Sequence, residues 1–202
     1  MLVRYGYLYY TILKCQSIES TTAAWQSGIL IFLIQLKKNV VSADKQIKKE
    51  TMKLRFKKAY MDVAARFAEL SHARRLHVGA IVVKDDRIIS IGYNGMPAGW
   101  DNNCEYEIVT EAEVGEDYDI TLKTRPEVLH AESNAIAKLA KSNDSGLGAD
   151  LFVTHSPCIE CAKLIFQSGI SRVYYGENYR DDAGVKFLEA SGVIVEQIQK
   201  DA

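Results

Sequence analysis

Two short segments of this chain contain the residue types that bind a metal ion. Residues 130–132 read His-Ala-Glu, and residues 157–161 read Pro-Cys-Ile-Glu-Cys. A structural zinc site is closed by four protein ligands, whereas a catalytic site keeps one position open for water. His130, Cys158 and Cys161 supply three ligands, so the pattern favours a catalytic zinc site.

The spacing of these residues is suited to hydrolysis. Cys158 and Cys161 are three residues apart, so at the start of a helix both lie on one face, where the helix dipole favours thiolates. His130, at the start of a second helix, reaches the same ion if the two N-termini are level. Zinc lowers the pKa of bound water to about 7, and we interpret Glu132 as the general acid and base beside it.

Alone, a Cys-x-x-Cys pair also fits a structural half-site or a redox pair. Together with His-x-Glu, it resembles the motif of zinc nucleobase deaminases, His-x-Glu followed by Pro-Cys-x-x-Cys.

The elements needed to position these residues can be predicted from residue 52 onward. Apolar residues at steps of three to four predict an amphipathic helix over 53–72. Two β-rich runs, 78–84 and 87–93, flank Asp85-Asp86 and predict a hairpin. Residues 96–129 have little periodicity, and 105–119 contain seven acidic side chains. We predict that this segment runs over the surface, and assign it no helix or strand.

The C-terminal half has a regular pattern. We expect helices from about 130, from Pro157 in a first turn to a stop at Gly169, and over 181–190. Strands are expected over 151–154, 173–176 and 193–195. Helix, hairpin and βα repeats together predict an α/β fold, a three-layer α/β/α sandwich around a mixed five-stranded sheet whose last strands are parallel.

Charge is distributed unevenly along the chain. Residues 1–51 contain seven Lys or Arg against three acidic residues, net +4, whereas residues 52–202 contain eighteen against twenty-three, net −5. The formal net charge of −1 provides no general basic surface for nucleic acid. We therefore expect small-molecule partners and no nucleic acid.

The first 51 residues do not have the pattern of the rest. Their apolar run, 28–36, is well below the roughly 20 residues needed to span a bilayer, and the order of features does not match a secretory signal. We interpret 1–51 as a weakly structured extension and 52–202 as the functional domain, with Met52 as a hypothetical natural start. Four cysteines, two of them in Cys-x-x-Cys, do not suggest a disulfide framework, so a cytoplasmic location is expected.

One part of the sequence points to a particular family. Residues 75–99, RLHVGAIVVKDDRIISIGYNGMPAG, with HAESNAI from His130 and PCIECAKLIFQSGI from Pro157, closely resemble deoxycytidylate (dCMP) deaminases. The likeness covers 52–198. It implies a cytidine deaminase-like fold and hydrolysis of dCMP to dUMP and ammonia by zinc-activated water, supplying the precursor for thymidylate synthesis. The alternatives are a zinc deaminase acting on tRNA adenosine or free cytidine, and a non-catalytic zinc-binding module.

The resemblance also implies roles for individual residues. It assigns a phosphate clamp to Arg75, Tyr179 and Arg180, a sugar-hydroxyl contact to Asn94, and a pyrimidine-carbonyl contact to the backbone N–H of Ala131. Asn94 fits equally well as a turn residue with positive φ. Arg75 could equally be a solvated charge after a helix.

Regulation and assembly are implied only by the resemblance. Many family members are hexamers that are activated by dCTP with Mg²⁺ and inhibited by dTTP. The likeness places the activator site in a loop over 92–103, although Asn-Gly and Ala-Gly also simply form turns. Candidate contacts are Gly92, Tyr93, Gly95, Met96, Gly99 and Asn102. Some members hold a second zinc, but this chain has no second Cys-x-x-Cys, so we predict one zinc per subunit.

Overall fold

The centre of the fold is a mixed five-stranded sheet. The structure, a computed structural model, describes residues 52–111 and 118–199. The predictions for residues 1–51 lie outside these residues. Strands follow the order β2-β1-β5-β6-β7, with β1 antiparallel to both neighbours and β5, β6 and β7 parallel. Their bounds are Gly79–Lys84 for β1, Arg87–Tyr93 for β2, Asp150–His155 for β5, Arg172–Glu177 for β6 and Ile194–Gln197 for β7.

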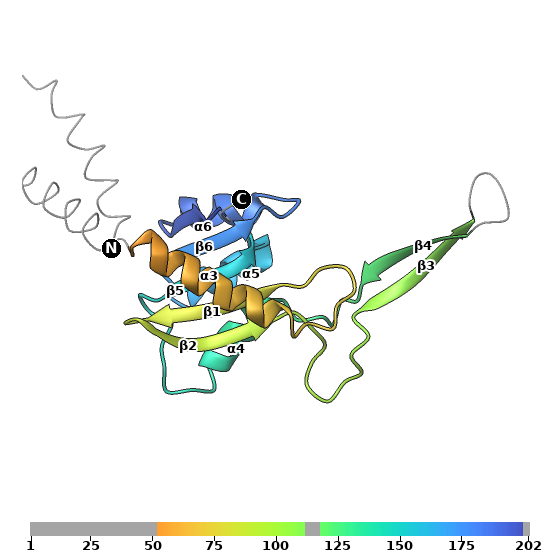
Figure 1. Ribbon diagram of the computed structural model, residues 1–202, viewed down its shortest axis with the longest axis horizontal. Coiled ribbons are helices and arrows are strands. Elements are labelled where there is room, and N and C mark those ends of the chain that lie inside the picture. Colours follow the sequence, from red (N-terminus) through yellow and green to blue (C-terminus); the bar gives the residue numbers. More distant parts are fainter. Residues whose placement is uncertain (1–51, 112–117, 200–202) are drawn as a thin grey trace, which may run out of the picture. The chain divides into compact units, whose positions relative to one another are not determined.

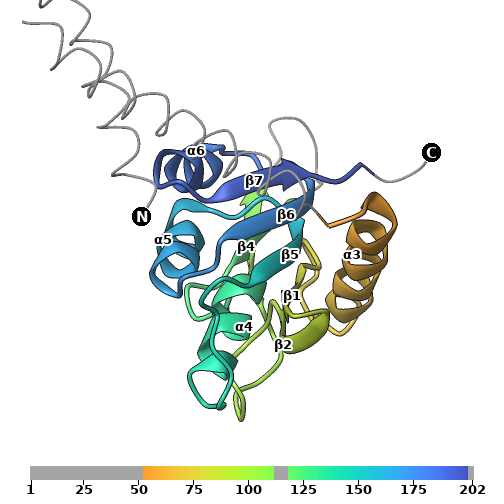
Figure 2. The same cartoon turned by 90° about the vertical axis from the view of Figure 1, so that its left-hand side faces the viewer.

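Helices cover both faces of this sheet. Helix α3, Leu54–Ala68, lies on one face, and the opposite face carries α4, Ala131–Leu139, α5, Ile159–Gln167, and α6, Ala183–Ala190 (Figure 2). The predicted three-layer α/β/α sandwich is therefore confirmed. Because both faces are covered, the central strand β5 is apolar without alternation, and Leu151, Phe152 and Val153 are fully buried.

Two predicted chain reversals have the expected backbone. Asp85 and Asp86 have φ values of 50° and 58°, the positive pair that a two-residue hairpin turn of type I′ requires. Helix α5 ends at its C-cap Ser168, and Gly169 follows with a φ of 78°, which is the usual glycine stop. Helix α3 ends at Ala68, earlier than the predicted 72.

A second, two-stranded sheet was not predicted. Strands β3, Glu105–Glu111, and β4, Tyr118–Thr124, form an antiparallel hairpin that extends away from the five-stranded sheet (Figure 1). The prediction of a segment without strands was therefore wrong. Tyr118, Ile120 and Leu122 alternate with polar residues in β4, a pattern typical of a strand, but the seven acidic side chains of 105–119 outweighed this signal in the prediction.

No helix within the described ranges is both long and apolar enough to cross a membrane.

Candidate active site

Two of the three predicted metal ligands occupy the same position in two helices. His130 is the N-cap of α4 and Cys158 is the N-cap of α5, and both have extended backbone angles. An N-cap side chain usually accepts a hydrogen bond from the first turn, but neither of these does so. Both side chains are therefore available to a ligand. Pro157 precedes the N-cap rather than lying in the first turn as predicted.

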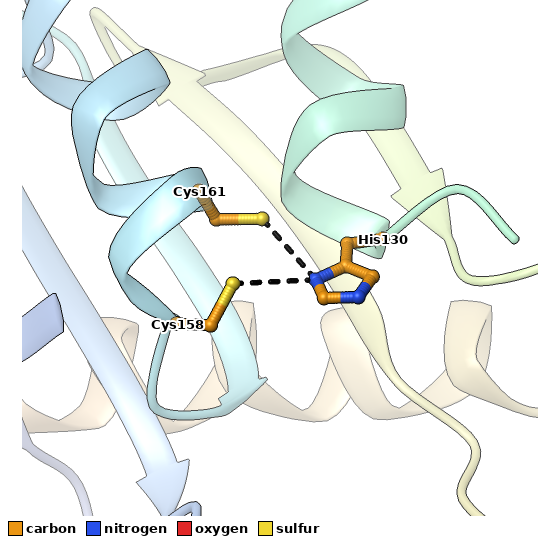
Figure 3. Close-up of side chains that lie close together, drawn as sticks. All are labelled: His130, Cys158 and Cys161. Atoms are coloured by element: carbon orange, nitrogen blue, oxygen red, sulfur yellow. Dashed lines mark hydrogen bonds between the residues drawn. The ribbon is translucent and has the colours of Figure 1, made fainter. Parts of the chain in front are cut away.

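The three ligand atoms converge (Figure 3). His130 Nδ1 lies 3.5 Å from Cys158 Sγ and 3.4 Å from Cys161 Sγ. All three atoms lie within 4.8 Å of one another. In tetrahedral zinc, Zn–S bonds of about 2.3 Å and Zn–N bonds of about 2.1 Å separate sulfur from nitrogen by about 3.6 Å. The observed spacing fits that geometry.

The pKa values of the two thiols also favour the binding of a cation at this position. Hydrogen bonds from Cys161 and His130 lower the pKa of Cys158 to about 3. The pKa of Cys161 is raised, because its neighbour Cys158 and burial both disfavour a second thiolate. The pKa of His130 is raised mainly by its contact with Cys158. A divalent cation supplies the positive charge that allows both sulfurs to ionise.

Glu132 lies in the first turn of α4 and is buried. Its side chain lines a cavity that His130 and Cys158 also line. Burial raises its pKa to about 7, against smaller lowering contributions from a backbone hydrogen bond and the charge of His130. A carboxyl group with this pKa can both accept and return a proton near neutral pH, as a general acid and base must.

Close packing of α4 on β2 positions His130 and Glu132. A Cβ atom at Gly92 would lie 2.1 Å from the Ala131 carbonyl oxygen and 2.6 Å from the Ala135 nitrogen. Only glycine allows the helix to approach the strand this closely.

A cavity of about 260 Å³ adjoins the ligands. Its wall contains the predicted residues Arg75, Asn94, Ala131 and Tyr179. Arg180 lies at an exposed position, with its guanidinium carbon 5.3 Å from the centre of the Tyr179 ring. The structure therefore places two of the three predicted clamp residues in the wall and the third against the Tyr179 ring.

The side-chain amide of Asn94 has two backbone partners. Its Oδ1 accepts the Val78 N–H at 2.8 Å, and its Nδ2 donates to the Leu76 carbonyl at 2.8 Å. Among the described residues other than glycine, positive φ occurs at Asp85 and Asp86 only. The interpretation of Asn94 as a turn residue with positive φ was therefore wrong. A side-chain amide offers two donor hydrogens and two acceptor lone pairs, so half of its hydrogen-bonding capacity remains.

Residues that sequence reasoning missed also line this cavity. Glu105 and Thr124 come from the unpredicted hairpin. Ser156 is buried, and its Oγ accepts the backbone N–H of Tyr179 at 2.7 Å. Its position directly before the Pro-Cys motif was the available signal for Ser156, and the alternation of apolar and polar residues over 118–124 was the signal for the strand that contains Thr124.

The candidate effector loop has contacts within the protein. Gly95 forms a backbone bridge with Leu129, Met96 packs on the cluster that contains buried Cys104, and the Tyr93 carbonyl accepts the side-chain amide of Asn134 at 3.0 Å. Gly99 has a φ of 88°, which suits a turn, and the carbonyl of Asn102 contacts the Cys104 thiol at 3.6 Å.

Three converging metal ligands beside a cavity that a buried carboxyl group also lines define a zinc-dependent hydrolase, here a deaminase. The chain belongs to the cytidine and deoxycytidylate deaminase family, whose zinc-binding region matches residues 54–177.

Individual relatives agree with this assignment. The crystal structure of dCMP deaminase from the cyanophage S-TIM5 in complex with dCMP and dUMP is 44% identical, with a TM-score of 0.63, and the match covers 73% of this chain and 99% of that chain. Deoxycytidylate deaminase of Mycobacterium phage D29 is 39% identical over 118 residues, 57% of this chain and 90% of its own. ComE operon protein 2 of Bacillus subtilis is 41% identical over 128 residues, 63% of this chain and 62% of its own, so the chain spans less than two thirds of that relative.

Proposed function

We propose that this enzyme hydrolyses dCMP to dUMP and ammonia, and so supplies the precursor for thymidylate synthesis. One observation carries the proposal: Glu132, two of the three ligands and most of the candidate nucleotide contacts line a single cavity, and the third ligand, Cys161, lies beside the other two. The likeness to the S-TIM5 enzyme, which binds dCMP and dUMP, supports this choice of nucleotide.

His130, Cys158 and Cys161 would hold a zinc ion, which would lower the pKa of a bound water molecule to about 7. Glu132 would accept a proton from the attacking water as the water oxygen bonds to C4 of the pyrimidine, and would return that proton to ring nitrogen N3. The same carboxyl group would then move the remaining hydroxyl proton to the amino group. The C4–N bond breaks as ammonia leaves, and the water oxygen becomes the new carbonyl.

The remaining substrate contacts follow from positions in the cavity wall. Ala131 is the first residue of α4, where a backbone N–H has no partner within the helix and can donate to the pyrimidine carbonyl. Asn94 offers its remaining amide hydrogen to the sugar. Arg75 and Tyr179 bind the 5′-phosphate, with Arg180 beside them, because a guanidinium fork matches phosphate oxygens.

A substrate comparison tests this assignment. We expect kcat/KM for dCMP to exceed that for deoxycytidine by at least about 100-fold, the effect of a lost charge-assisted contact. Arg75→Ala should remove most of that preference, whereas Arg66→Ala, at an exposed position of α3, should not. A preference for deoxycytidine over dCMP in a spectrophotometric assay would exclude the clamp.

The alternative functions make different predictions in the same assay. A tRNA adenosine deaminase needs a basic face, whereas residues 52–202 have a net charge of −5. A free cytidine deaminase would not discriminate by phosphate. A non-catalytic zinc-binding module would turn over none of these substrates.

We further propose that the enzyme is a cytoplasmic hexamer, activated by dCTP with Mg²⁺ and inhibited by dTTP through the loop over 92–103. Support comes from the resemblance, and a reducing compartment suits the free thiols of Cys158 and Cys161. Initial rates at low dCMP concentration, with and without each effector, test the regulation, and light scattering tests the assembly. Rates unchanged by either nucleotide would exclude the proposed regulation.

We also predict one zinc per subunit, which elemental analysis checks.

A further inference from the structure

The base of the β3–β4 hairpin contacts the segment that contains Arg75. Glu105 is the first residue of β3 and is 1% exposed. Its carboxylate accepts the backbone N–H of Arg74 at 3.1 and 3.2 Å, one distance for each oxygen, and the backbone N–H of Arg75 at 3.3 Å. A buried carboxylate therefore fixes the main chain from which the Arg75 side chain starts.

Strand β4 contacts the side chain of Arg75. Thr124 is the cross-strand partner of Glu105, and its hydroxyl accepts a hydrogen bond from Arg75 Nη1 at 2.8 Å. Glu105, Thr124 and Arg75 all line the cavity. One cross-strand pair thus fixes the backbone of Arg75 through one strand and its guanidinium group through the other.

The two neighbouring arginines, Arg74 and Arg75, have side-chain partners of different charge. The Arg74 guanidinium pairs with Glu107 at 2.6 Å and lies 3.7 Å from Glu105. Arg75 instead donates to a neutral hydroxyl, which holds its side chain without compensating its positive charge. Preorganising a long side chain in this way reduces the entropy lost when it binds an anion.

We propose that Glu105 and Thr124 are positioning residues for the substrate phosphate, acting through Arg75. This inference rests on the proposed function, because it requires that Arg75 bind the 5′-phosphate. The hairpin base is then part of the nucleotide site.

The test compares Glu105→Gln and Thr124→Val with the matched control Glu107→Gln, which lies on the same strand, is exposed and contacts Arg74 rather than Arg75. We expect KM for dCMP to rise about tenfold in the first two variants, with kcat within about twofold. The control should keep the original KM. Thr124→Val removes only the hydroxyl, so it tests the claim even if Glu105→Gln does not fold.

A double-mutant cycle separates positioning from general stability. If Glu105 acts through Arg75, then Glu105→Gln in the Arg75→Ala background should change KM by less than about twofold. The same tenfold increase in that background, or unchanged KM in Glu105→Gln and Thr124→Val, would overturn the inference. If Arg75→Ala itself leaves KM for dCMP unchanged, the phosphate clamp of the proposed function is wrong as well.

Discussion

The three metal ligands differ in how readily they lose a proton. Cys158, with a pKa of about 3, is ionised at neutral pH, whereas Cys161 keeps its proton because the neighbouring sulfur and burial raise its pKa. Zinc binding must therefore deprotonate a buried thiol. Metal affinity should depend both on the presence of that thiol and on pH.

The first prediction concerns Cys161. We expect Cys161→Ser to lower zinc affinity at least about 100-fold, because a buried hydroxyl does not ionise at neutral pH and cannot replace a thiolate ligand. Cys104→Ser is the matched control, since Cys104 is also a buried free thiol but lies in a different cluster. Competition with a chelator of known affinity measures both variants, and equal zinc retention would contradict the ligand assignment.

The second prediction concerns pH. At pH 7 zinc binding should release about one proton from Cys161 and a further fraction from His130, whose pKa is also raised. Protons compete with the ion, so zinc affinity should decrease as pH falls below 7. Calorimetry in two buffers that differ in ionisation enthalpy measures the number of protons released. A value of zero would show that both thiols are already ionised without the metal.

At the scale of elements, the site depends on two helix N-termini. Helix α4 begins directly after His130, and α5 begins directly after Cys158. The spacing of the motifs and the βα pattern were enough to predict this arrangement. The predicted hairpin, helices and parallel strands also agree with the structure, because each has a buried face or a defined turn residue.

Other parts of the site were not predicted. The β3–β4 hairpin contains Glu105, and many of its described side chains are exposed, so its acidic sequence was interpreted as a surface segment. The alternation of Tyr118, Ile120 and Leu122 with polar residues in β4 was the strand signal that the acidic composition outweighed. The relation of Arg180 to Tyr179 likewise depends on side-chain placement after β6 and not on a repeating pattern.

The third prediction concerns the contact between β2 and α4. Gly92→Ala should destabilise the protein by about 2 kcal/mol, because its Cβ would meet backbone atoms of Ala131 and Ala135 that cannot move independently of the helix. Gly95→Ala is the control, since no atom lies within 4 Å of a Cβ there. Chemical denaturation compares the two free energies of unfolding. Equal values would mean that the approach of α4 to β2 is not tight.

At the scale of the whole molecule, the metal joins parts of the chain that are distant in sequence. His130 and the Cys158–Cys161 pair belong to different helices of one layer, each packed beside the other over the sheet. An ion that binds only when both helices are in place stabilises the folded state by mass action.

The fourth prediction follows from this linkage. Removing zinc with a chelator should lower Tm by roughly 10 °C, since a ligand at about 1,000 times its Kd contributes about 4 kcal/mol and each kcal/mol shifts Tm by about 2–4 °C at this size. Adding zinc back should restore the original Tm. In Cys161→Ser the chelator should lower Tm by less than half as much, since an affinity about 100-fold weaker leaves the ion at only about 10 times its Kd. Scanning calorimetry provides all three values.

We propose that Glu132 moves protons for a hydrolysis at a zinc ion held by this chain. The most direct test of this proposal is dCMP turnover by Glu132→Gln, measured together with zinc content and compared with Glu160→Gln, whose exposed side chain pairs with Lys163 on the outside of α5. We expect Glu132→Gln to retain zinc and to lose about 10²–10⁴-fold in kcat, and Glu160→Gln to keep both its zinc and its kcat. Undiminished turnover in Glu132→Gln with zinc bound would contradict the proposal.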